Sequence, residues 1–142
     1  MTGAPIVAGT GETVEVEAAE GVAEAYLTGA AERPGVLLFV DAIGLRPRIE
    51  EMADRIASWG YVVLAPHVFY RDGRAADLAP TVDLREPGAR EEFFASGVAD
   101  RVAALTPDRS GPDSDAWVRA LEEHAGAGPI GVKEHLRPFL PV

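Results

Sequence analysis

Two charged side chains stand where a parallel sheet would bind a ligand. Asp41 follows the apolar run 36–40, and Arg71 comes shortly after a second apolar run, 61–65. If both runs are parallel strands, their carboxyl ends meet at one edge of the sheet, which is where open α/β sheets bind ligands. The position makes Asp41 a candidate catalytic carboxylate. It also makes Arg71 a candidate for binding a substrate carboxylate, because a guanidinium suits bidentate contacts with anions.

Each of these side chains also has a purely structural explanation. Asp41 could cap the helix that follows the first strand, and the pattern alone favours such a cap over a catalyst. Arg71 could pair with its neighbour Asp72 or face solvent, and the pattern alone favours this role as well. Both alternatives stay open at this point.

The sequence offers no side chain that can be named as a nucleophile. Its 142 residues include no cysteine, which excludes disulfides, thiolate metal sites and a cysteine nucleophile together. None of the serines stands in a Gly-X-Ser-X-Gly motif. The three histidines, of which His67 is interpreted as a loop residue and His124 as a helix-end residue, are too few and too separated for a metal site. We therefore expect no metal site.

Composition limits the class of partner. A length of 142 residues predicts one domain, and 47% hydrophobic with 25% charged residues is typical of a soluble globular chain. The longest apolar run is far too short to cross a membrane. Thirteen Lys and Arg against 23 Asp and Glu give a net charge of −10, which repels nucleic acid and anionic lipid. The first twenty residues do not resemble a secretory signal, so a cytoplasmic location is expected.

The first half of the chain predicts strands and a helix in alternation. Segments 13–17 and 22–27 have the pattern of an antiparallel hairpin at a sheet edge. Segments 36–40 and 61–65 are continuous apolar runs, typical of parallel strands covered on both faces. Between them, apolar residues recur at helical spacing over 47–60, so the segment predicts a βαβ unit in a mostly parallel sheet.

The second half is expected to begin with a long surface loop, 66–88. A helix follows within 93–105, another opens near 111–113, and a short strand lies at 130–132. The acidic residues of the first helix are expected on its solvated face: Glu50, Glu51 and Asp54.

Residues 34–71, from Pro-Gly-Val-Leu-Leu-Phe-Val-Asp-Ala-Ile-Gly to Ala-Pro-His-Val-Phe-Tyr-Arg, resemble the dienelactone hydrolase family of α/β-hydrolases. The resemblance implies hydrolysis of lactones or related carboxylic esters, without a cofactor, by a cysteine in a Gly-X-Cys-X-Gly elbow assisted by Asp and His. It also implies that Asp41 matches an acid that interacts with the resting nucleophile, and that the backbone N–H of Ala42 is an oxyanion-hole donor. Arg71 matches an arginine that binds the carboxylate of a small-molecule substrate.

The sequence departs from the family's pattern after residue 132. We interpret 1–132 as the N-terminal half of a dienelactone-hydrolase-like domain and 133–142 as a divergent tail, so the expected fold is a truncated α/β-hydrolase. Because the nucleophile and its Asp and His partners are missing, we expect no catalysis by this chain alone. The strand at 130–132 would lie at an open edge, and self-association through that edge is expected.

Two other functions stay open. The chain could be a non-enzymatic module that binds a small acid, or a protein, through the edge at 130–132. Alternatively, a separately encoded second half could supply the elbow and the rest of the catalytic triad. Reading the DNA downstream of codon 132 in all frames would distinguish these possibilities.

Overall fold

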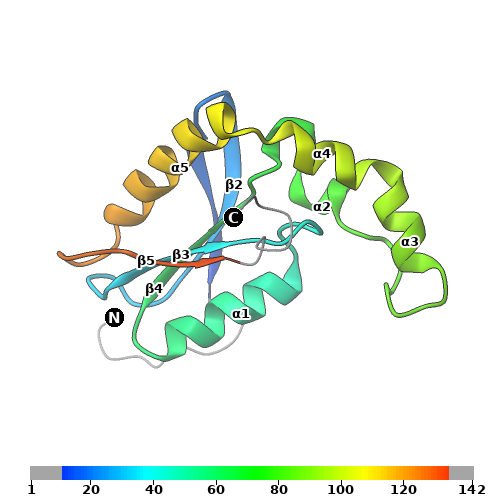
Figure 1. Ribbon diagram of the computed structural model, residues 1–142. Helices are drawn as coiled ribbons and strands as arrows, with labels where there is room; N and C mark the ends of the chain where they lie inside the picture. The colour runs from blue at the N-terminus through cyan, green and yellow to red at the C-terminus, as the bar shows by residue number, and fades with distance from the viewer. Residues whose placement is uncertain (1–10, 135–142) are drawn as a thin grey trace.

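A computed structural model describes residues 11–134, which form one five-stranded sheet with helices on both of its faces (Figure 1). The spatial order of the strands is β1-β2-β4-β3-β5. Their bounds are Glu12–Ala18 for β1, Gly21–Thr28 for β2, Gly35–Phe39 for β3, Val62–Pro66 for β4 and Gly131–Glu134 for β5. The helical segments are α1 (Pro47–Ser58), η1 (Tyr70–Asp72), α2 (Ala75–Leu78), α3 (Ala89–Phe93), η2 (Phe94–Val98), α4 (Ala99–Ala104) and α5 (Pro107–Glu122).

The predicted hairpin is confirmed. Strands β1 and β2 pair antiparallel, with Glu15 opposite Glu24, and β1 lies at one edge of the sheet. On its other side β2 pairs antiparallel with β4, where Leu27 lies opposite Leu64. The turn between β1 and β2 therefore lies at the same end of the sheet as the carboxyl end of β4.

The predicted parallel centre is confirmed as well. Strand β3 pairs in parallel with β4 and with β5, and Leu37 lies opposite both Leu64 and Val132. All five residues of β4 are buried, which explains its uninterrupted apolar sequence, because such a strand is covered on both faces. The fold is α/β, and the centre of its sheet is parallel, as the sequence predicts.

Helices α1 and α5 cover opposite faces of the sheet (Figure 1). Ile49 and Ala53 of α1 are fully buried in one core cluster, together with Leu38 of β3. Trp117 and Leu121 of α5 belong to the other cluster, which lies against the opposite face. The molecule thus has three layers. In each helix, apolar residues three and four positions apart form the face that packs against the sheet.

One acid of α1 contradicts the expectation from sequence. Asp54 is buried, with 4% of its surface exposed, and Oδ1 of its carboxylate accepts a hydrogen bond of 2.9 Å from the Tyr26 hydroxyl on β2. Its prediction as a solvated residue was wrong because a strand distant in sequence supplies the donor. Glu51, by contrast, is exposed as predicted.

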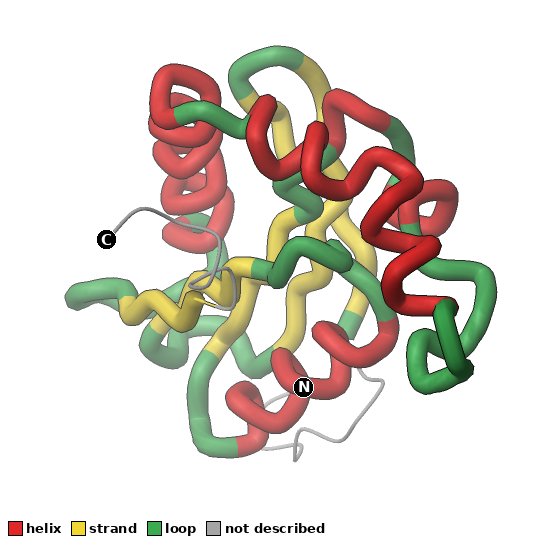
Figure 2. Tube along the Cα trace, turned by 45° about the vertical axis from the view of Figure 1, so that its right-hand side comes forward, coloured by secondary structure: helices red, strands yellow, loops and turns green. Residues whose placement is uncertain are grey.

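The segment after β4 is more ordered than a surface loop. His67, Val68 and Phe69 are buried, and η1 and α2 follow them. The predicted helix within 93–105 is present as α3, η2 and α4, with a kink at Ser96 and Gly97, where Gly97 takes a positive φ of 112°. Figure 2 shows this series of short helices as a group of its own, apart from α1 and α5.

The last helix starts earlier than the sequence suggests. Helix α5 begins at Pro107, with Thr106 at its N-cap, and it contains Pro112 in its interior. The prediction of a start near 111–113 was wrong because Pro107 already occupies the first helical position, which a proline tolerates without loss of a hydrogen bond. None of the helices described between residues 11 and 134 is suited to crossing a membrane.

Candidate functional site

Asp41 lies directly beyond the carboxyl end of β3 and organises the loop that follows. Its Oδ1 accepts the backbone N–H of Ile43 at 3.1 Å and that of Gly44 at 3.2 Å. The Gly44 N–H also bonds to the Asp41 carbonyl oxygen at 3.0 Å, which closes a turn in which Gly44 has a φ of 99°. This turn favours glycine at position 44, because other side chains rarely adopt that conformation.

Arg46 binds the same carboxylate with both ends of its guanidinium. Its Nη1 lies 2.7 Å from Oδ1 of Asp41 and its Nη2 lies 3.0 Å from Oδ2. Burial alone would raise the pKa of Asp41, but the Arg46 guanidinium and the N–H groups of Gly44 and Ile43 hold it below its usual value. Asp41 is therefore ionised and firmly placed.

The structure does not support the helix-cap explanation for Asp41. The N-cap position of α1 belongs to Arg46, and no side chain caps that helix. The carboxylate stabilises its own loop instead, and that loop positions Ala42. Ala42 is 2% exposed, and no residue between 11 and 134 accepts a hydrogen bond from its N–H.

Arg71 lies in η1, beyond the carboxyl end of β4, and its side chain is only 16% exposed. Its Nε donates to Oε1 of Glu20 at 2.7 Å, and its Nη1 donates to Oδ2 of Asp113 at 2.7 Å. The guanidinium also lies 4.7 Å from the centroid of the Tyr70 ring. Neither solvent exposure nor the suggested pair with Asp72 is found, so that part of the structural explanation was wrong.

Asp113 is the centre of this network, and the sequence analysis missed its role. It is 2% exposed, and its Oδ1 accepts the Tyr70 hydroxyl at 2.9 Å and the Ala19 N–H at 3.1 Å. The network joins α5, η1 and the turn between β1 and β2. A signal was available, because Asp113 precedes Ala116 and Trp117 by three and four positions and so shares their buried helical face.

A small cavity of about 40 Å³ lies between η1 and α4. Its lining includes Arg71, Asp72, Arg101 and Arg109, together with apolar side chains such as Phe69. Two buried nitrogens of these arginines, Nη2 of Arg71 and Nε of Arg101, have no hydrogen-bond acceptor among the described residues. Three arginines and one aspartate are therefore among the residues that line one space.

His67 is a core residue and not a loop residue, so that interpretation was wrong. Only 2% of its surface is exposed, and its Nε2 lies 2.7 Å from the carbonyl oxygen of Gly73. A carbonyl can only accept, so Nε2 carries the hydrogen and Nδ1 is left without a partner in the described part of the chain. Burial lowers the pKa of His67, which favours this neutral form.

The comparisons with known proteins identify the family of this chain. The model of the dienelactone hydrolase family matches residues 23–127, which include both β3 with its Asp41 loop and β4 with η1. The chain belongs to the dienelactone hydrolase family. No curated protein matches the chain.

Solved structures show the same dienelactone hydrolase fold. A putative dienelactone hydrolase from Klebsiella pneumoniae superposes with a TM-score of 0.61 at 16% identity, over 87% of this chain and 48% of the other. The protein m3DLH gives a TM-score of 0.60 at 21% identity, over 90% and 50%. A dienelactone hydrolase-like promiscuous phosphotriesterase from metagenomic libraries gives 0.53 at 18% identity, over 88% and 48%. The chain spans about half the length of these structures.

Within this dienelactone hydrolase fold, Asp41, Ala42 and Arg71 lie at the same edge of the sheet, because all three follow the carboxyl ends of parallel strands. They belong to two separate networks, one around Arg46 and one around Asp113. No group of three His, Cys, Asp or Glu side chains within 11–134 is arranged to hold a metal ion.

Proposed function

We propose that this chain carries the oxyanion-stabilising and acid-binding side of a cytoplasmic hydrolase that acts on lactones or related small carboxylic esters. The observation that carries the proposal is the Asp41 loop, which lies at the ligand-binding edge of a dienelactone hydrolase domain and is fixed by a two-point ion pair with Arg46. Membership of the family points to hydrolysis, and the loop supplies the geometry for one part of it.

In this proposal the backbone N–H of Ala42 donates to the oxygen that becomes negative when an ester carbonyl is attacked. The described residues give that N–H no other acceptor, and the ion pair between Asp41 and Arg46 keeps the loop from moving when charge develops. Asp41 itself stays ionised and does not act as an acid, because its pKa is lowered. Arg71 binds the carboxylate of the substrate.

The nucleophile is not supplied by these 142 residues. They contain no cysteine and no Gly-X-Ser-X-Gly motif, so the sequence identifies no side chain that could form an acyl intermediate. In serine proteases a complete oxyanion hole and substrate binding retain about 10³–10⁴-fold of rate enhancement after loss of the nucleophile, but here one of the two oxyanion donors is missing as well. We therefore propose that the chain alone binds ligands of this class but does not turn them over.

The test uses the purified chain with p-nitrophenyl acetate and with a simple lactone. Hydrolysis at the buffer rate is expected, with no difference between the wild type and Asp41→Ala. Turnover above the buffer rate that disappears in Asp41→Ala would overturn the proposed lack of activity.

A second arm tests hydrolysis itself. The DNA downstream of codon 132 is read in all frames, and any segment that encodes an elbow, an Asp and a His is co-expressed with this chain. Turnover that appears in the mixture and falls in Asp41→Ala supports the hydrolase proposal. Absence of such a segment, or a mixture that stays inactive, would refute it.

A non-enzymatic module that binds a small acid is the second candidate. It is favoured by one observation: Arg71 lies beyond the carboxyl end of β4, at the edge where open α/β sheets bind ligands.

A further inference from the structure

We propose that the neutral ring of His67 holds η1 in its place and that protonation of this ring releases η1, so that the position of Arg71 depends on pH. The proposal rests on three features of the described residues. They are the hydrogen bond of the ring, the surroundings of its second nitrogen and a cleft beside it.

The first feature is the hydrogen bond that closes the segment carrying η1. His67 follows directly after β4, and its Nε2 donates to the carbonyl oxygen of Gly73 at 2.7 Å. Tyr70 and Arg71 lie between these two residues in sequence. The backbone N–H of His67 donates to the Glu24 carbonyl oxygen at 2.8 Å, so the backbone is fixed and the ring is the part that can turn. The ring is therefore a positioning group for η1.

The second feature is the surroundings of Nδ1. The ring is buried, and Nδ1 has no acceptor within residues 11–134, so a proton added there would bring an unpaired positive charge into the interior. Burial accordingly lowers the pKa of His67, and the positive charge of Arg101 on α4 adds to this effect. The Gly73 carbonyl and the carboxylates of Glu24 and Asp72 act in the opposite direction and are outweighed. The charged ring is thus disfavoured where the neutral ring lies.

The third feature is a cleft of about 340 Å³ whose lining includes His67, Glu15 and Glu24. The two glutamates lie directly opposite each other in the β1–β2 register, an arrangement of like charges that destabilises a hairpin. Arg74 also lines the cleft, but it is 73% exposed and lies 3.6 Å from Glu24, so it offsets little of this charge. A protonated ring that turns into the cleft therefore gains carboxylate partners.

Two positions of the ring are favoured by opposite protonation states. Neutral His67 stays inside and donates to Gly73, whereas charged His67 lies in the cleft and gives up that bond. Because the proton favours the outward position, the equilibrium between the two positions shifts with pH.

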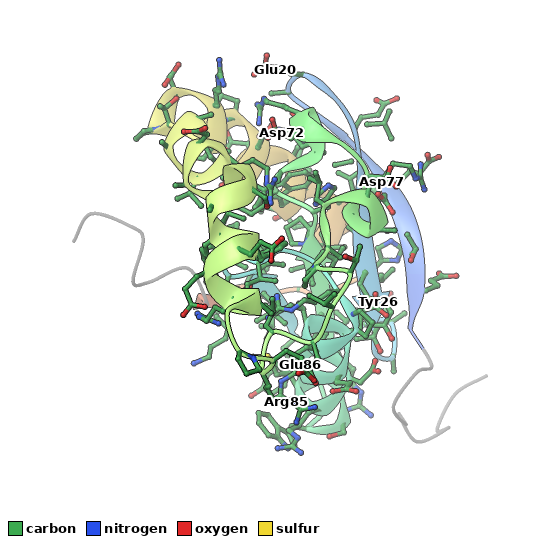
Figure 3. The ribbon with its side chains drawn as sticks, turned by 90° about the vertical axis from the view of Figure 1, so that its right-hand side faces the viewer. Glu20, Tyr26, Asp72, Asp77, Arg85 and Glu86 are labelled. Atoms are coloured by element: carbon green, nitrogen blue, oxygen red, sulfur yellow. The ribbon has the colours of Figure 1, made fainter. Side chains whose placement is uncertain are left out.

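Loss of the bond loosens η1 without removing it from the fold. Tyr70 and Arg71 keep their bonds to Asp113, and Arg71 keeps its bond to Glu20. Figure 3 shows Asp72 of η1 close to the hairpin turn that carries Glu20. The inference deepens the proposed function, and it rests on that function only for the claim that Arg71 contacts a substrate.

The first measurement follows the ring in the full chain. Nitrogen-15 NMR of labelled histidine between about pH 8 and about pH 5 distinguishes the two neutral tautomers and the charged form. His67 should be the Nε2–H tautomer at the upper end and should become charged while the chain is still folded, with a midpoint below its usual value of 6.5. The spectrum of His67→Gln identifies its signal.

The second measurement follows η1. Trp117 is buried, and its ring centroid lies 6.1 Å from that of Tyr70. The second of the two tryptophans, Trp59, is exposed, so Trp59→Phe leaves an emission that reports the contact with η1. In this background the emission should change over the same pH range as the His67 signal, while the far-ultraviolet circular dichroism stays constant.

Two substitutions separate the hydrogen bond of the ring from its charge. Glutamine can donate to Gly73 but does not titrate, so His67→Gln should keep the emission of the high-pH state throughout. His67→Phe keeps a ring without a donor and should show the emission of the low-pH state already at about pH 8. Glu24→Gln should move the midpoint to lower pH, because it removes a carboxylate that favours the charged ring. His124→Gln is the matched control, an exposed histidine whose loss should leave the transition unchanged.

Three results would overturn the inference. They are an Nδ1–H tautomer at the upper end of the titration, a change of emission that persists in His67→Gln, and a joint loss of emission and circular dichroism, which would mean that His67 gains its proton only on unfolding. If His67→Phe does not fold, His67→Gln and the NMR titration still decide. None of these measurements needs turnover, so their failure leaves the hydrolase proposal standing, and failure of the hydrolysis test leaves the response of η1 to pH in place.

Discussion

Asp113→Asn should destabilise the fold far more than Glu20→Gln, although each change removes one carboxylate charge from the same arginine. The side chain of Asp113 is 3% exposed and that of Glu20 is 54% exposed. An exposed ion pair contributes roughly 0–1 kcal/mol, because water and salt screen it. Removing one partner of a buried pair costs about 3–5 kcal/mol, because the remaining charge stays buried without compensation.

The structure narrows the expected value for Asp113→Asn. The carboxylate accepts three bonds, two at Oδ1 and one at Oδ2. Asparagine has one acceptor oxygen, so if it keeps the bonds to Tyr70 and Ala19 its NH₂ group faces Arg71. Because Arg71 retains Glu20, we expect a loss of about 2–3 kcal/mol in the free energy of unfolding, compared with less than about 1 kcal/mol for Glu20→Gln.

Urea unfolding followed by tryptophan fluorescence is a suitable assay. Trp117 is 1% exposed and its ring centroid lies 6.1 Å from that of Tyr70, so it reports the docking of α5 directly. A double-mutant cycle with Arg71→Met isolates the pair, and the cost of Asp113→Asn should fall by more than about 1 kcal/mol in that background. Equal costs for the two acids, or a cycle without coupling, would refute the reasoning that burial decides the strength of this network.

Three further predictions concern other parts of the fold. His67→Gln should reduce the loss of stability as the pH falls below about 6.5. Burial lowers the pKa of His67, so the unfolded chain gains the proton first. Urea unfolding at a series of pH values should show the change in His67→Gln but not in the exposed control His124→Gln. Tyr26→Phe should reduce the loss of stability between pH 10 and about 12, because burial and Asp54 raise the pKa of Tyr26 to about 12 and the unfolded chain ionises first. Absorbance titration of tyrosinate measures this raised pKa, and an unchanged titration curve in Tyr26→Phe would contradict the prediction. Val132→Lys should raise the monomer fraction in analytical ultracentrifugation, because Val132 is 58% exposed and lies on β5, which pairs on one side only among the described residues. An unchanged monomer fraction would place any self-association elsewhere.

The strands of the sheet could be predicted because burial on two faces leaves a simple signal. The five residues of β4 are all buried and all apolar or proline, and nothing in their sequence competes with that assignment. The hairpin before them alternates for a different reason, since β1 lies at the edge and exposes one of its faces. In both cases the local pattern carries the whole of the structural information.

The buried acids could not be placed in this way, because their partners are distant in the chain. Asp54 bonds to a residue 28 positions away, and Asp113 pairs with Arg71 at a separation of 42. A helical wheel shows that Asp113 shares the apolar face of α5, but it does not show which cation meets it. The charge of a residue is visible in a sequence, whereas the group that compensates it depends on the packed fold.

Asp41 and Arg71 illustrate what this means for a candidate site. Both were candidates for ligand contact because of their positions, and the structure places both at the carboxyl edge of the sheet. Most of their hydrogen-bonding capacity is already used, however. Arg46 binds both oxygens of Asp41, and two acids bind two of the three nitrogens of Arg71. Ligand recognition at this edge must then come from a group that no described residue has paired, the backbone N–H of Ala42.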